Sequence, residues 1–175
     1  MLLIVQVLSV FLVAIAMALA LAHALELPGK RRLDKETYIA VQAIYYPGFT
    51  IGGAVGEAGG LLATLALLAI TPLKSAAFWW VVVAVVALLA MNAAYWLVTH
   101  PVNKFWLREH EPQGLGRRFF AFDPLRRSGP AETGEDRWKR FRDRWESSHV
   151  VRAVLASVGL LALVIGVAVG ATPTR

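Results

Sequence analysis

Four long apolar runs with few polar interruptions organise this chain of 175 residues. A helix that crosses the hydrocarbon core of a bilayer takes about 20 residues. The four runs reach that length, and they cover residues 2–22, 49–70, 78–98 and 150–171. Because 57% of all residues are hydrophobic, the chain has no room for a large soluble domain beside them. The pattern predicts one all-α domain, an integral membrane four-helix up-down bundle.

The first apolar run ends in the letters AHA, which resemble the cleavage site of a secretory signal peptide. However, its first residues, MLLIVQV, contain no basic residue, and the run exceeds the about 7–15 apolar residues of a signal. We therefore expect a retained membrane span. Pro28-Gly29 is expected to end its helix, and His23 and Glu26 share a face just before that end. His23 is then either an interfacial histidine or part of a site.

A short amphipathic helix is predicted between the first two spans. Asp34 or Thr37 can cap it, and apolar residues recur at helical spacing over Thr37–Tyr46. Tyr45 and Tyr46 suit the aromatic belt of a membrane surface. We therefore expect this helix to lie at the membrane interface.

The net charge of +6 is unevenly distributed. The connections after the first and third runs hold most of the basic residues, namely Lys30, Arg31, Arg32, Lys35 and those between Lys104 and Arg144. The other side of the predicted bundle has only Lys74 and Arg175. By the positive-inside rule, the long connections, including residues 101–148, are cytoplasmic and both termini lie outside. We expect a bacterial inner membrane location and lipid contacts rather than nucleic-acid binding. The chain has no cysteine, which excludes thiolate chemistry.

The connection after the third run is expected to be irregular over Glu111–Glu135, with its phenylalanines (Phe119, Phe120 and Phe122) dipping into the interface and His110 solvated. From Asp136 a helix resumes and leads into the fourth run. One stripe of this helix carries Trp138, Phe141, Trp145, His149 and Arg152.

Polar groups inside the spans are candidates for a site. Glu57 lies about 13 Å inside the second span, at 1.5 Å per residue, where an unpaired carboxylate is costly. Asn92 lies at a similar depth in the third span, which predicts an Asn92–Glu57 hydrogen bond. Arg152 either snorkels or binds an inward acidic group. Small residues at Gly52, Gly56 and Gly60 allow close helix packing, and could form the face of a homo-oligomer.

The up-down topology brings three histidines, His23, His100 and His149, to the cytoplasmic end of three different helices. Facing helices build metal and cofactor sites in this way, and imidazole suits haem or a transition metal. No local metal or haem motif accompanies these histidines. Alternatively, a cofactor-free site could use His and Glu as acid and base, with Arg152 stabilising an oxyanion.

The segments AHALELPGK, YIAVQAIYYPGF, THPVNKFW and RWESSHVVRAVL resemble small four-helix membrane proteins related to anthrone oxygenases, a family largely of unknown function. The resemblance covers most of the chain. It implies an oxygenase that acts on a lipophilic aromatic compound, without an assured metal requirement. It also implies roles for Asn103, His149 and Arg152.

We therefore expect a membrane-embedded oxidoreductase, an oxygenase of a lipophilic aromatic molecule, with Glu57 as a buried acid. The expected pocket is lined further by Glu26, Tyr45, Tyr46, Asn92, Tyr95 and Trp145. The alternative is a non-catalytic protein that binds haem, metal or lipid, or an accessory subunit of a larger membrane complex. A proton-coupled transporter that uses Glu57 would require several copies of the chain.

Overall fold

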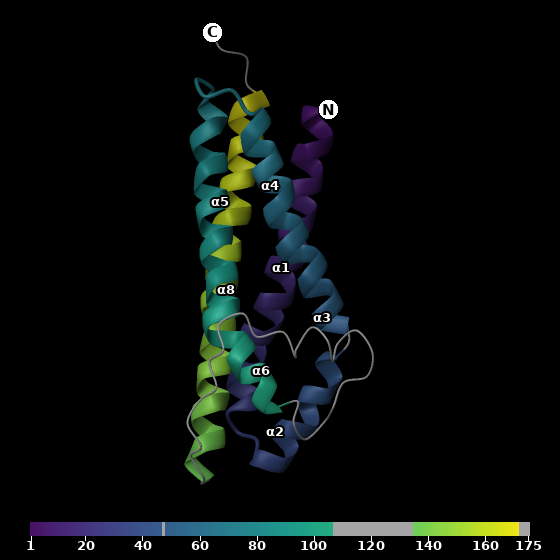
Figure 1. The fold of residues 1–175 in the computed structure, drawn as a ribbon, viewed down its shortest axis with the longest axis vertical. Coiled ribbons are helices and arrows are strands. Elements are labelled where there is room, and N and C mark those ends of the chain that lie inside the picture. The colour runs from purple at the N-terminus through teal and green to yellow at the C-terminus, as the bar shows by residue number, and fades with distance from the viewer. Residues whose placement is uncertain (47, 107–134, 172–175) are drawn as a thin grey trace.

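A computed structural model describes residues 1–46, 48–106 and 135–171 (Figure 1). The loop predicted over 111–135, together with His110, lies outside the described residues except for Glu135. The described part is helical and contains no strand. Its elements are α1 (Leu2–Lys30), α2 (Lys35–Gln42), the 3₁₀ turn η1 (Ala43–Tyr45), α3 (Gly48–Gly53), the π-helix η2 (Ala54–Ala58), α4 (Gly59–Ile70), α5 (Ala76–Ala94), the π-helix η3 (Tyr95–Thr99), α6 (His100–Trp106) and α8 (Glu135–Ala171).

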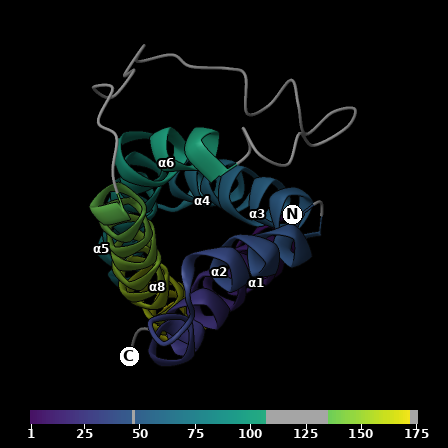
Figure 2. The same cartoon turned by 90° about the horizontal axis from the view of Figure 1, so that it is seen from below.

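Four helical stretches are long and apolar enough to span a membrane, which confirms the membrane-protein prediction at that level. They are Leu2–Lys30, Gly48–Ile70, Ala76–Asn103 and Arg137–Ala171. The start of α1 and the end of α8 lie at one end of the molecule, and α2 and α6 lie at the other (Figures 1 and 2). Three of the four stretches are longer at this second end than the sequence predicted.

The main core lies along α1, α4, α5 and α8, and alanine recurs at its contacts. Small side chains let the helix backbones approach closely, which is the usual packing mode in lipid. A second core, at the α2 and α6 end, is built from larger side chains: Tyr38, Ile39, Tyr45, Val102, Trp138 and Trp145. The stripe predicted on the last helix supplies both tryptophans of this cluster.

Pro28 does not end α1, contrary to the prediction, because the helix continues through it to Lys30. Proline is poorly tolerated in a helix interior, but here only the last turn follows it. The extra turn places Lys30 one turn beyond Glu26 on the same face, where the two side chains form an ion pair. This ion pair stabilises the additional turn of the helix.

His100-Pro101 does not end the third span either, since α6 continues from His100 to Trp106. Proline lacks the backbone N–H that would bond the carbonyl four residues earlier, which is that of Leu97. Arg144 of α8 donates to the Leu97 oxygen at 3.1 Å instead. The π-helix η3 immediately precedes the proline, and the His100 N–H bonds to the Tyr95 oxygen in the π pattern.

The helix between the first two spans begins at Lys35, with Asp34 as its N-cap. The Asp34 carboxylate accepts a hydrogen bond from the Thr37 N–H at 2.8 Å. Hydrogen bonding to the Thr37 side chain first, and then to its backbone N–H, lowers the pKa of Asp34. Of the two caps considered from the sequence, Asp34 is therefore correct. The α-helix ends at Gln42, earlier than expected, and Ala43–Tyr45 forms the 3₁₀ turn.

The glycine face of the second span packs within the chain rather than remaining available to a second copy. A Cβ atom at Gly56 would meet the Ala16 backbone nitrogen at 2.8 Å, and one at Gly60 would meet Val13 at 3.1 Å. At Gly52 it would meet Leu19 at 3.0 Å. All three positions face α1 within the same chain, and the homo-oligomer through this face stays a prediction.

We predict that Gly56→Ala destabilises the protein by about 1–3 kcal/mol, the usual cost of overpacking. The new methyl group would collide with the α1 backbone, which cannot rotate away as a side chain can. Gly59→Ala is the matched control, because its Cβ would meet only the Leu12 side chain, at 3.4 Å. Unfolding titrations in detergent compare the two, and equal stability would contradict the close approach.

Candidate functional site

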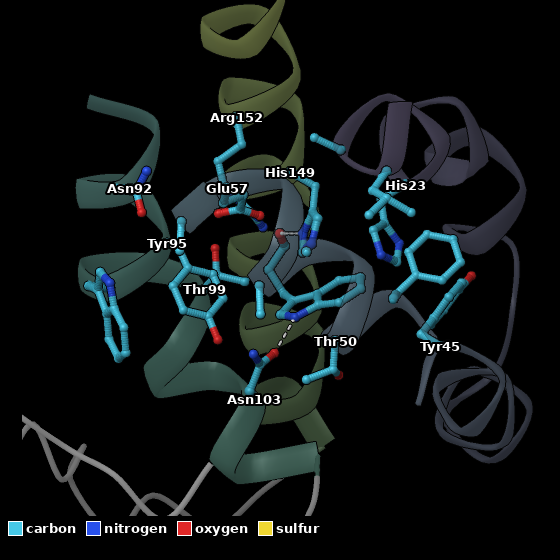
Figure 3. Close-up of a pocket in the computed structure, with 18 of the residues that line it drawn as sticks. His23, Tyr45, Thr50, Glu57, Asn92, Tyr95, Thr99, Asn103, His149 and Arg152 are labelled. Carbon is cyan, nitrogen blue, oxygen red and sulfur yellow. Dashed lines mark hydrogen bonds and ion pairs between the residues drawn. The ribbon is translucent and has the colours of Figure 1, made fainter. Parts of the chain in front are cut away.

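A cavity of about 190 Å³ lies between the helices, near the α2 and α6 end (Figure 3). Its lining comes from the four long segments, from η1 and from the residue after η1: Leu19, Ala20, His23, Tyr45, Tyr46, Phe49, Thr50, Gly53, Ala54, Glu57, Ala58, Asn92, Tyr95, Trp96, Thr99, Asn103, Trp145, His149 and Arg152. An apolar cavity of about 150 Å³ can hold benzene. This cavity therefore has room for a single substituted ring, and it is smaller than a porphyrin.

Both π-helices line this cavity. Glu57 lies on η2, and Tyr95, Trp96 and Thr99 lie on η3. A π turn inserts an extra residue into the helix, which displaces the backbone and redirects side chains, and such turns are frequent at functional sites. No pattern in the sequence predicts these π turns directly, although glycines lie near Glu57 and a proline follows η3.

Glu57 is paired with Arg152, which crosses from α8 and donates a hydrogen bond to the Glu57 carboxylate (Figure 3). Both side chains are largely buried. The Arg152 guanidinium also lies 5.2 Å from the centre of the Tyr95 ring. Of the two roles considered for Arg152, binding an inward acidic group is therefore correct.

The predicted Asn92–Glu57 hydrogen bond is wrong. The Asn92 amide donates to the carbonyl oxygen of Leu88, one turn earlier in its own helix, at 3.0 Å. A charged guanidinium is the stronger partner for a buried carboxylate, since charge-assisted hydrogen bonds are about twice as strong as neutral ones. Asn92 and Glu57 nevertheless line the same cavity.

His149 and His23 lie face to edge, with ring centres 4.3 Å apart. The His149 Nδ1 atom lies 2.9 Å from the Trp145 carbonyl oxygen, which can only accept. Nδ1 therefore carries the proton, and Nε2 is the nitrogen with a free lone pair. The Trp145 ring packs 4.1 Å from the His149 ring and fixes its orientation.

Asn103 holds Trp145 from the opposite side. The Trp145 indole N–H donates to the Asn103 side-chain oxygen at 2.7 Å. Ser148 in turn donates to the Trp145 carbonyl at 2.6 Å, so it accepts from the Thr99 hydroxyl at 2.8 Å. These bonds connect α8 to α6 and η3, so the wall of the cavity around His149 is rigidly supported.

A buried polar network adjoins His23 on the side away from His149, and Lys30 is its centre. The Lys30 ammonium lies 2.9 Å from a Glu26 oxygen and 3.5 Å from a Glu146 oxygen, and it donates to His23 Nδ1 at 3.3 Å. Tyr38 donates to the same Glu146 oxygen at 2.9 Å. The sequence reasoning treated Lys30 as a topology signal and did not single out Glu146, because both lie in strongly charged segments.

Tyr45 connects this network to the cavity. Its hydroxyl donates to Glu26 at 2.6 Å, and its ring packs against His23 with centres 4.5 Å apart. Burial, followed by the hydrogen bond to Glu26, raises the pKa of Tyr45. Burial likewise raises the pKa of Tyr46. Both phenols therefore remain protonated donors. Glu26 itself does not line the cavity and acts only through Tyr45 and Lys30.

The three histidines do not converge as predicted. His100 is buried, but it packs against Trp96, with ring centres 4.9 Å apart, and lies 3.4 Å from the Tyr95 hydroxyl rather than lining the cavity. Within the part of the chain that the structure describes, no group of three or more His, Cys, Asp or Glu side chains could hold a metal ion. The metal centre of His23, His100 and His149 is thus not formed, because His100 contacts Trp96 and Tyr95 and does not line the cavity with the other two.

The remaining predicted residues do come together. Apart from Glu26 and His100, every candidate proposed from the sequence lines the cavity. No protein-family model matches the chain, and no curated protein and no solved structure is similar to it. The resemblance to the anthrone oxygenase-like proteins therefore stays a prediction.

Proposed function

We propose that this chain is a membrane-embedded oxidoreductase that uses dioxygen to oxidise a lipophilic phenol bound in the cavity. The observation that carries this proposal is that a base and a cationic donor line the same cavity. His149 Nε2 is the unprotonated nitrogen, and Arg152, whose guanidinium is paired with Glu57, belongs to the same lining. A phenol satisfies both, because its proton can move to His149 and its oxygen can then accept from Arg152.

The aromatic walls also favour this type of ligand. Phe49, Tyr45, Trp145, Tyr95 and Trp96 surround the cavity and offer ring faces and edges to a bound aromatic ring. Deprotonation makes the ring electron-rich. For a hydroquinone, two electrons and two protons then pass to dioxygen, which gives a quinone and hydrogen peroxide. This reaction shares dioxygen and an aromatic substrate with the anthrone oxygenase-like family, but it transfers no oxygen atom to the product. A single ring also suits the cavity volume better than three fused rings.

The topology belongs to the same proposal. We place the chain in a bacterial inner membrane as an up-down bundle, with both termini outside and α2, α6 and the start of α8 on the cytoplasmic side. The concentration of basic residues at that end supports this orientation. α2 and η1 would then lie at the membrane interface. The two histidines, His23 and His149, would lie slightly deeper in the bilayer.

We predict that His149→Ala lowers oxygen uptake with a hydroquinone by about 100-fold or more, since a general base contributes about 10²–10⁴-fold. The measurement uses purified protein in lipid nanodiscs and an oxygen electrode. His100→Gln is the control, because it removes a buried imidazole that does not line the cavity. Unchanged uptake in His149→Ala would remove this base from the mechanism. A haem spectrum or a stoichiometric metal in the purified protein would replace the proposed acid–base mechanism with cofactor chemistry.

A further inference from the structure

The exposed part of the cavity lining lies on the π-helix η2. η2 packs on α1, whereas η3 packs on α8, and both turns line the cavity. Ala54 and Ala58 of η2 line the cavity and are exposed, and Trp96 of η3 is half-buried. In Figure 1, α4 runs beside α5, whereas α3 lies apart from α6. The exposed alanines therefore mark the mouth.

The depth of this mouth places it in the hydrocarbon region. Ala54 and Ala58 lie six and ten residues into the Gly48–Ile70 span, about 9 and 15 Å along the helix axis. The hydrocarbon core is about 30 Å thick, so Ala58 reaches its middle. Residues beside the mouth, such as Val55 and Ile51, are exposed and apolar, as expected of a lipid-facing surface. A ligand would therefore reach the cavity from the bilayer.

The far wall of the cavity is polar, in contrast to the mouth. His23, His149 and Arg152 are each at least nine-tenths buried and lie on α1 and α8, whereas the alanines of η2 are exposed. The cavity thus presents hydrogen-bonding groups at buried positions and apolar side chains at exposed ones. Its volume of about 190 Å³ is filled by a single ring, so any longer part of the ligand must leave through the mouth.

We propose that the site takes an amphiphile drawn directly from the bilayer, with one phenolic ring as its head and an apolar tail. The ring lies against His149 and Arg152, and the tail passes between η2 and η3, beside Ala54 and Ala58, into the lipid. The identity of the ring rests on the proposed function, whereas the sideways route for the tail rests on the position of the mouth. A tailless phenol can occupy the inner end but leaves the mouth unfilled.

The test compares the binding of dodecylhydroquinone and methylhydroquinone to the protein in lipid nanodiscs. The concentration of each compound is given as its mole fraction in the bilayer, so that stronger partitioning of the tailed compound into lipid does not count as tighter binding. We expect the tailed compound to bind at least tenfold more tightly than the tailless one. Ala58→Phe, which fills the mouth, should weaken dodecylhydroquinone at least tenfold and methylhydroquinone less than threefold. Val55→Phe, on the same turn but outside the lining, should change neither by more than twofold.

Equal affinities of the two compounds, or equal effects of Ala58→Phe and Val55→Phe, would overturn the sideways route. If Ala58→Phe fails to fold, as judged from its helical signal and melting temperature, Ala54→Leu repeats the test with a smaller side chain. Binding and oxygen uptake are measured separately. If neither compound binds, the phenolic head is wrong, and the proposed function is wrong with it. If the compounds turn over but the mouth variants have no effect, only the sideways route is wrong.

Discussion

Lys30→Met is expected to lower the free energy of unfolding by about 3–5 kcal/mol, the usual cost of removing one partner of a buried ion pair. Lys30 is only 4% exposed, and its ammonium group lies between the carboxylates of Glu26 and Glu146. Glu146 is only 1% exposed and cannot turn to water when its cation is lost. Methionine fills a similar volume, so the loss would report charge rather than a cavity.

The size of this effect should depend on Glu146. In the double variant Lys30→Met/Glu146→Gln no buried charge is left unpaired, and Tyr38 can still donate to the amide oxygen. We expect the double variant to recover at least half of the lost stability. Arg31→Met, which removes an exposed charge from the next residue, should change stability by less than about 0.5 kcal/mol. Equal losses in Lys30→Met and Arg31→Met, measured by unfolding titration in detergent, would contradict the buried network.

The same network shows where sequence reasoning reached its limit. The long apolar runs predicted the four spans, because burial in lipid requires uninterrupted apolar helices. Local sequence predicts a helix end at Pro28, since proline disfavours helix in its neighbourhood. The last turn of α1 forms anyway, because it brings Lys30 to partners on α8 that lie more than a hundred residues away in the chain. A tertiary contact of this kind leaves no local pattern.

The sequence predicted how deep a side chain lies in its span, but not the direction in which the side chain points around the helix axis. The spacing placed Glu57 and Asn92 at one level, and both do line the cavity. The partner of Glu57 was wrong because Glu57 itself lies in the π-helix η2, where a spacing of 3.6 residues no longer gives the direction of a side chain. His100 illustrates the same effect, since it lies at the predicted end of its helix but faces Trp96 instead of His149. Helical spacing alone assumes 3.6 residues per turn, which a π turn breaks.

The Glu57–Arg152 pair should give the strongest energetic coupling of any pair across the cavity. Either side chain alone would leave a largely buried charge without its partner, in the apolar part of two spans. We expect Glu57→Gln and Arg152→Gln each to cost about 3–5 kcal/mol of unfolding free energy. The double variant should cost no more than either single variant, because it leaves two neutral amides that can bond to each other.

The ion pair of Arg142 and Asp143 provides the control within the same chain. Its oxygen and nitrogen lie 2.9 Å apart, but Asp143 is 52% exposed, and exposed pairs contribute about 0–1 kcal/mol. A double-mutant cycle on Arg142→Gln and Asp143→Asn should therefore give less than about 1 kcal/mol of coupling. The cycle on Glu57 and Arg152 should give several times more, and a coupling no larger than that of the exposed pair would show that the cavity end of Arg152 is solvated. In that case the guanidinium would be hydrated instead of poised for a phenolate oxygen, and the chemistry assigned to it would lose its physical basis.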